Sequence, residues 1–155
     1  MTDAPNRLYL LDASNYIFRA FHSTSPAAGG SGMNTSSGLP TNAILVFTNM
    51  VRKLLREHEP SHFAAVFDVR GTKNFRHERY SEYKANRKET PSDLKVQFPY
   101  FRPLVEALGL HVVEKPGYEA DDVIATLCRK AKADGIEAVI VSSDKDLYQL
   151  LNDDV

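Results

Sequence analysis

The sequence has a single cysteine, so it cannot form an internal disulfide. Cys128 stands among the apolar residues of a predicted helix, and we expect a buried thiol there. No apolar run approaches the roughly 20 residues that cross a membrane, and the chain does not start with a signal peptide. These absences predict a cytoplasmic protein without a membrane partner.

Two kinds of ligand site are also missing from the sequence. There is no Gly-x-x-x-x-Gly-Lys-Ser/Thr loop, and the glycine-rich stretch 29–32 does not follow a predicted strand, which argues against a nucleotide-binding protein. No cluster of histidine and cysteine offers a zinc site. The histidines are scattered, and we expect surface or packing roles for them: His22, His58, His62, His77 and His111.

Charge is balanced overall and uneven locally. The net charge is −1, yet residues 70–88 hold seven basic and two acidic side chains, which is +5. The rest of the chain holds the other twelve basic and eighteen acidic side chains, which is −6. A basic segment on an acidic body indicates a local contact with an anionic partner.

The apolar pattern predicts a single α/β domain. With 155 residues, 43% of them hydrophobic, the chain is long enough for one core. Short apolar runs predict strands at 8–11, 63–67, 110–113 and 138–141. Helices are expected at 15–22, at 41–57 with Thr41 as N-cap, at 92–108 with Gly109 as its stop and at 119–133. A loop is expected at 23–41, and a short last helix that carries Leu147, Leu150 and Leu151. This alternation predicts a mostly parallel central sheet with helices on both faces.

Acidic residues follow three of the predicted strands. Asp12 and Asp68 come directly after their strands, and Asp144 follows the last strand within three residues. Four more acids open the next helices: Glu119, Asp121, Asp122 and Asp146. Ligands of open α/β sheets bind at the carboxyl ends of the strands, so these seven side chains should meet at one edge. Taken singly, each acid is also explained as a helix N-cap or by the helix dipole.

Seven carboxylates at one edge predict a metal site. Their mutual repulsion would raise their pKa values unless a cation were bound. Oxygen ligands favour Mg²⁺ or Mn²⁺ over zinc. Two such ions, roughly 4 Å apart, are suited to phosphodiester hydrolysis, because one activates water and the other stabilises the leaving oxygen.

Residues 75–87 predict a nucleic-acid-binding helix. Helical spacing places cations and aromatic rings on one face: Arg76, Tyr80, Tyr83, Lys84 and Arg87. Glu78 and Glu82 fall on the opposite side. Cations neutralise phosphates and aromatic rings stack on bases, which suits a single strand. The alternative is a solvated helix whose tyrosines pack on the body.

Several short motifs, in order, carry a family resemblance. They are Leu-Asp-Ala-Ser (11–14), Phe-Arg-Ala-Phe-His (18–22), Gly-Leu-Pro-Thr (38–41), Val-Phe-Asp (66–68), Tyr-Lys-Ala-Asn-Arg (83–87), Gly-Tyr-Glu-Ala-Asp-Asp (117–122) and Ser-Asp-Lys-Asp-Leu (143–147). Over nearly its whole length the chain resembles the 5′-nuclease (flap endonuclease) family, especially the 5′→3′ exonuclease domain that begins bacterial DNA polymerase I. Ala13 and Ser143 depart from the family pattern without removing an acid.

The resemblance implies a fold and a function. The fold would be the PIN-like 5′-nuclease core with a helical arch at about 70–90. The function would be two-metal hydrolysis of DNA near a 5′ end or flap, in replication and repair. The matching residues are, around the first metal, Asp12, Asp68, Glu119, Asp121 and Asp122; in the second-metal group, Asp144 and Asp146; in the arch, Lys84 and Arg87; and near the substrate strand, Tyr83 and Arg19.

The resemblance also implies a C-terminal truncation. Further second-metal aspartates and the element that grips duplex DNA lie beyond residue 155 in the family, and a polymerase region follows in some members. We therefore expect a fragment that retains the first metal site and cleaves poorly alone.

Two other functions stay open. A PIN-like ribonuclease would share the acidic edge but would not need the cationic segment 70–88. A non-catalytic nucleic-acid-binding module would bind in a salt-sensitive way without metal-dependent cleavage.

Overall fold

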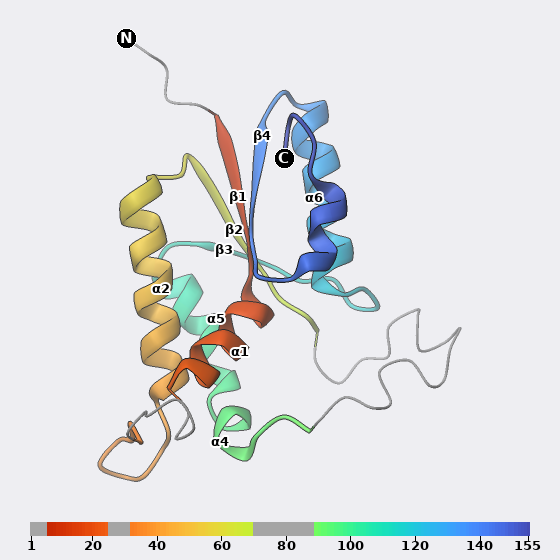
Figure 1. Ribbon diagram of the computed structural model, residues 1–155. Coiled ribbons are helices and arrows are strands. Elements are labelled where there is room, and N and C mark those ends of the chain that lie inside the picture. The colour runs from red at the N-terminus through yellow and green to blue at the C-terminus, as the bar shows by residue number, and fades with distance from the viewer. Residues whose placement is uncertain (1–5, 25–31, 70–88) are drawn as a thin grey trace.

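A four-stranded parallel sheet organises the chain. The computed structural model describes residues 6–24, 32–69 and 89–155. The strands are β1 (Arg7–Asp12), β2 (His62–Val66), β3 (His111–Val113) and β4 (Glu137–Val141), in the spatial order β3-β2-β1-β4 (Figure 1). Every neighbouring pair is parallel, which confirms the predicted sheet. All four carboxyl ends therefore lie at the same edge.

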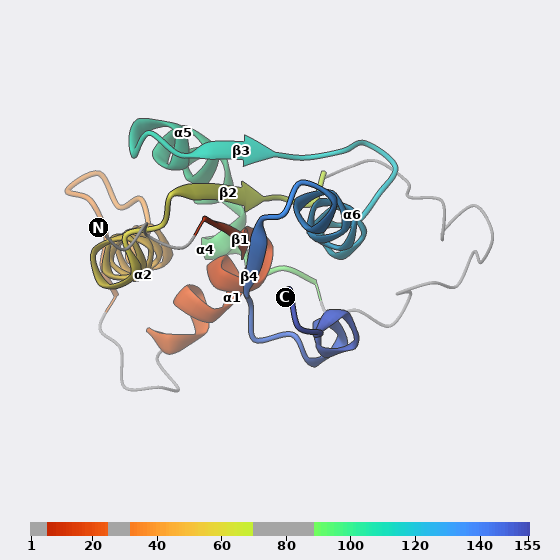
Figure 2. The same ribbon diagram turned by 90° about the horizontal axis from the view of Figure 1, so that it is seen from above.

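Helices cover both faces of this sheet. They are α1 (Ala13–Ser23), α2 (Asn42–His58), α4 (Ser92–Lys95), α5 (Phe98–Ala107), α6 (Ala120–Ala133) and the 3₁₀ helix η2 (Lys145–Leu150). Figure 2 shows α2 and α6 on opposite sides of the strands. The helices α1, α2 and α5 share one core, and α6 and η2 share the other. The predicted two-faced arrangement is confirmed.

Side-chain alternation in β1 builds the two cores. Tyr9 and Leu11 pack with α1, α2 and α5, whereas Leu10 packs with α6. Leu10 and Leu11 are both fully buried. Burying a side chain of this size contributes about 1.5–3 kcal/mol, so a central strand with apolar residues on both faces is strongly held.

The prediction of one continuous helix over 92–108 is wrong, because this segment forms two helices, α4 and α5. Pro99 has no N–H, and its ring would clash with the carbonyl of Lys95 if one helix continued. The chain breaks between Lys95 and Phe98 instead. Gln97, at the break, is fully buried, and its side chain makes hydrogen bonds to residues on either side of it.

Gln97 joins three elements at this break. Its Oε1 accepts from the backbone N–H of Ile44 at 3.1 Å. Its Nε2 donates to Oδ1 of Asn42 at 2.9 Å and to the carbonyl of Asp93 at 2.8 Å. The amide thereby links the start of α2 to α4 and α5.

The predicted helix ends are close to the observed ones. Glu119 is the N-cap of α6 and not its first residue. Thr41 is the N-cap of α2, but its hydroxyl donates to the carbonyl of Met33 at 3.1 Å and makes no capping bond. Part of the predicted loop at 23–41, residues 25–31, lies outside the described residues.

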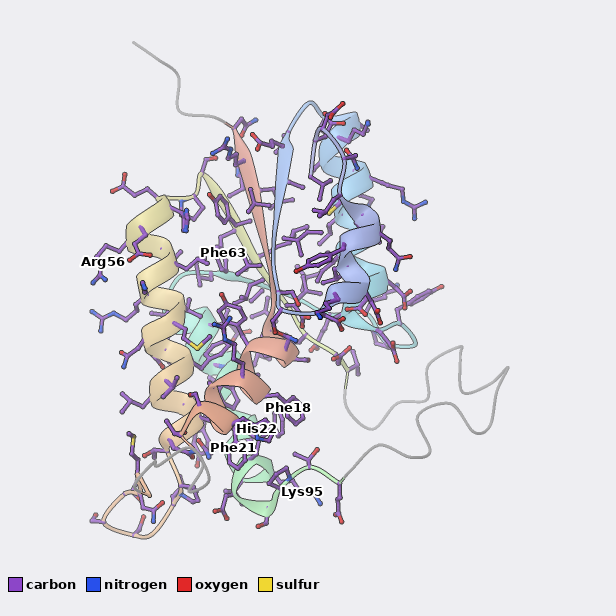
Figure 3. All side chains as sticks on the ribbon, viewed as in Figure 1. Phe18, Phe21, His22, Arg56, Phe63 and Lys95 are labelled. Atoms are coloured by element: carbon purple, nitrogen blue, oxygen red, sulfur yellow. The ribbon has the colours of Figure 1, made fainter. Side chains whose placement is uncertain are left out.

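His22 has a packing role, as expected. Figure 3 shows it beside Phe18 and Phe21 on α1. Its ring centroid lies 6.4 Å from that of Phe18 and 5.5 Å from that of Phe21. The Phe18 ring centroid in turn lies 6.2 Å from that of Phe98 in α5.

In the part of the chain that the structure describes, no helix has the length and apolarity to span a membrane.

Candidate active site at the carboxyl edge of the sheet

The carboxyl edge gathers acidic side chains from four segments, which we call the rim: Asp12, Asp68, Glu119, Asp121, Asp122, Asp144 and Asp146. Asp12 ends β1, Asp68 lies two residues after β2, and Asp144 lies three residues after β4. The helix α6 begins at the same edge, since the backbone N–H of Ala120 donates to Oδ1 of Asp68 at 2.8 Å. The parallel register brings these segments together.

Four rim aspartates use one oxygen to satisfy a backbone N–H. The donors are Asn15 to Asp12 (3.0 Å), Ala120 to Asp68 (2.8 Å), Glu119 to Asp122 (3.1 Å) and Asp146 to Asp144 (3.0 Å). These are capping contacts at the N-termini of α1, α6 and η2. Helix capping therefore explains the position of one carboxylate oxygen in each of these aspartates. It does not explain the role of the second oxygen.

The rim carboxylates also repel one another. Burial, followed by the charges of Asp12, Asp144, Asp68 and Glu119, raises the pKa of Asp121 to about 6. Burial also raises the pKa of Asp12, against hydrogen bonds from Asn15 and Ser142 that favour its charged form. Four of the other six predicted acids are thus close enough to Asp121 for their charges to raise its pKa.

A metal ion is chemically compatible with the rim, although the side chains do not enclose one. In residues 6–24, 32–69 and 89–155, no three His, Cys, Asp or Glu side chains are arranged to hold an ion. The donors are all carboxylate oxygens, the type that Mg²⁺ and Mn²⁺ prefer. Asp68 and Asp144 each have one oxygen without a hydrogen bond inside the described ranges.

Two further predicted site residues, one acid of the rim and one cation on α1, are exposed. Asp146 is exposed in the first turn of η2. Arg19 is exposed on α1, with its guanidinium carbon 5.9 Å from the centre of the Tyr16 ring. The predicted arch residues lie outside the described residues: Arg76, Tyr80, Tyr83, Lys84 and Arg87.

Two polar residues that contact the rim or the segment carrying Asp144 were not predicted from the sequence. Ser142 donates from its hydroxyl to Oδ2 of Asp12 at 2.9 Å and accepts from the backbone N–H of Asp144 at 3.0 Å. The Asn15 side chain accepts two hydrogen bonds from Ser143. The available signal was position alone, since Asn15 lies three residues after Asp12 and Ser142 two before Asp144.

Comparison with known proteins supplies the family. Residues 7–155 match the model of the family described as "5'-3' exonuclease, N-terminal resolvase-like domain". The chain belongs to this family. The resemblance carried by the sequence motifs is therefore confirmed.

Curated relatives of this 5′-3′ exonuclease domain include longer proteins. DNA polymerase I of Mycobacterium tuberculosis (strain ATCC 25618 / H37Rv) is 44% identical over 148 residues, covering 96% of this chain and 16% of the relative. The 5′-3′ exonuclease of Aquifex aeolicus (strain VF5) is 40% identical over 148 residues, covering 96% of this chain and 49% of the relative. The chain thus spans about half, or far less, of these relatives.

Solved structures agree on the fold. A zinc-bound T5 5′-exonuclease superposes with a TM-score of 0.67 at 23% identity, over 96% of this chain and 53% of that one. A T5 flap endonuclease in a product-type complex with DNA and metal ions gives 0.68 at 21% identity, again over 96% and 53%. The chain has the same α/β fold as these proteins.

Proposed function

We propose that this chain supplies the acidic half of a metal-dependent 5′-3′ exonuclease or flap endonuclease site, which hydrolyses DNA phosphodiesters near a 5′ end in replication and repair. The observation that carries the proposal is the rim, where four segments bring carboxylates together although their negative charges repel one another. Burial and four neighbouring charges raise the pKa of Asp121 to about 6. Such a concentration of charge serves function when a cation binds to it.

Two divalent cations, Mg²⁺ or Mn²⁺, are the proposed cofactors. Asp12, Asp68, Glu119, Asp121 and Asp122 would hold one ion, and Asp144 and Asp146 would contribute to the second. When bound, the ions supply an activated water and stabilise the leaving oxygen. The carboxylate side chains would have to turn towards a common point. Their mutual repulsion opposes this movement when no cation is bound, and coordination to a cation favours it. Two solved T5 structures support this proposal, since one was co-crystallised with metal ions and the other has bound divalent zinc.

The chain's own residues would position the reacting groups. The capping contacts keep Asp12, Asp68 and Asp144 at the ends of their strands with one oxygen directed to the backbone. Because the second oxygens of Asp68 and Asp144 make no hydrogen bond inside the described ranges, they remain available as ligands. The N-termini of α1 and α6 add a positive dipole end beside the carboxylates, which favours their charged form.

The substrate strand would be held by cations outside the rim. Arg19 is exposed on α1, directly after the strand that carries Asp12. Lys84 and Arg87 would contact the reacting phosphate, with Arg76, Tyr80 and Tyr83 along the single strand. In a longer protein, a polymerase region could follow this domain, as in the DNA polymerase I relatives.

A cleavage assay tests this proposal directly. The 155-residue chain, and a chimera that appends the other half of the Aquifex aeolicus relative, are incubated with a labelled 5′-flap duplex in Mg²⁺, Mn²⁺ or EDTA. We expect metal-dependent cleavage by the chimera and little or none by the chain alone. Asp121→Asn should abolish it, and Asp153→Asn, at an exposed aspartate outside the rim, should not.

Two other results would favour other functions. Binding of the flap by both proteins, with no cleavage in either metal, would support the non-catalytic binding module. Faster cleavage of a matched RNA than of the DNA flap would support the PIN-like ribonuclease.

A further inference from the structure

We infer that Ser142 and Asn15 are positioning residues. They fix the segment that carries Asp144 against Asp12 and thereby set the distance between the Asp12 and Asp144 carboxylates. The inference rests on the proposed function and concerns the same rim. Neither residue is an expected ligand. Each joins two parts of the chain that are about 130 residues apart in sequence.

The Ser142 hydroxyl is oriented by its two partners. The backbone N–H of Asp144 can only donate, so the Ser142 oxygen accepts that bond, at 3.0 Å. The single hydroxyl proton then points to Oδ2 of Asp12, at 2.9 Å. An alanine at this position would remove both contacts, whereas a threonine would retain the hydroxyl.

The Asn15 side chain is oriented in the same way. The backbone N–H of Ser143 donates to its Oδ1 at 3.1 Å, which identifies that atom as the amide oxygen. The Ser143 hydroxyl donates to the same oxygen at 2.7 Å. The backbone N–H of Asn15 meanwhile donates to Oδ1 of Asp12 at 3.0 Å. Asn15 and Ser142 therefore hold Asp12 and the segment after β4 from two sides.

This link is needed because the sheet ends before the carboxylates. The pairing of β1 with β4 stops at Leu11 opposite Val141, so no ladder bond holds residues 142–144. The charges of Asp12 and Asp144 are close enough to interact unfavourably. Without the side-chain bonds, repulsion would move the segment of Asp144 away from β1. The two polar residues oppose that movement.

Ser61 offers a matched control. Its hydroxyl also accepts one hydrogen bond and donates another, both at 3.1 Å, with the backbone of Arg7. It links the beginnings of β1 and β2, at the opposite edge of the sheet. Ser61→Ala therefore removes the same number of hydrogen bonds as Ser142→Ala without touching the rim.

The first readout is amide hydrogen exchange of the metal-free chain. We expect Ser142→Ala to speed exchange at the Asp144 N–H and Asn15→Ala to speed it at the Ser143 N–H, with Ser142→Thr close to wild type. Ser61→Ala should leave both amides unchanged. If Ser142→Ala leaves the Asp144 amide as protected as in wild type, the inference is overturned.

The second readout is Mn²⁺ binding, measured by titration calorimetry. Partners that orient ligands typically cost about 10- to 100-fold in metal affinity when removed, and we expect a loss of this size for Ser142→Ala. Ser142→Thr and Ser61→Ala should bind like wild type. An equal loss in Ser142→Ala and Ser61→Ala would overturn the inference, because it would indicate general destabilisation.

The same experiments separate this inference from the proposed function. If wild type binds no Mn²⁺, the proposed metal use fails and so does the positioning of ligands, whatever the exchange data show. If wild type binds Mn²⁺ and Ser142→Ala binds it equally well, the proposed function stands and only this inference is lost.

Discussion

Replacing Asp121 by asparagine should stabilise the metal-free chain at pH 8. The pKa of Asp121 is raised from 3.8 to about 6, so the folded state disfavours its charged form. A shift of this size corresponds to about 3 kcal/mol in full. Asp121 is only partly buried, and solvent screening reduces the figure to about 1.5 kcal/mol. Loss of a favourable helix-dipole contact at the start of α6 leaves about 1 kcal/mol.

The sign of the effect follows from the direction of the shift. A raised pKa contributes stability below about pH 4, where the unfolded group is also protonated, and that contribution is lost as the pH rises through about 6. Wild type therefore carries the full penalty at pH 8. Asparagine never carries it, so the gap between the two proteins should shrink as the pH falls from 8 to 4.

Thermal unfolding followed by circular dichroism in EDTA measures this gap. A gain of 1 kcal/mol should raise the Tm by about 2–4 °C at this chain length. Asp153→Asn, at an exposed aspartate outside the rim, should give no such gain. Saturating Mg²⁺ should reverse the order, because it binds the wild-type rim more tightly. An Asp121→Asn protein less stable than wild type in EDTA at pH 8, or a gap independent of pH, would refute the reasoning.

Three further predictions concern the cores. Gln97→Ala should lower the free energy of unfolding by about 2–4 kcal/mol in urea titration, since it removes three hydrogen bonds of a fully buried side chain; the exposed Gln149→Ala is the control, and an equal effect of both would contradict the role of Gln97. Phe101→Ala should cost about 3–5 kcal/mol in the same assay, because the ring is fully buried, and a cost near zero would mean that this core is not closed. Burial raises the pKa of the Cys128 thiol, so a thiol reagent at pH 8 should modify it far more slowly in the folded chain than in urea; equal rates would place the thiol at the surface.

Local patterns in the sequence predicted most of the fold. Apolar runs ending at Asp12 and Asp68 gave β1 and β2, and the helical spacing from Ile44 to Leu55 gave α2. These elements are readable because side-chain periodicity and capping depend on neighbours within a few residues. The break at Gln97 was also encoded nearby, in Pro99, but the helical spacing on either side concealed it.

The sequence by itself determined which residues are acidic, the strands and helices that carry them, and the motifs that identify the family. Only the tertiary structure decided how they interact. The order β3-β2-β1-β4 brings Asp12 and Ser142, 130 residues apart, within 2.9 Å, and burial together with four neighbouring charges raises the pKa of Asp121. Hydrogen bonds and desolvation depend on distances between segments remote in sequence, and those distances exist only after the sheet has formed.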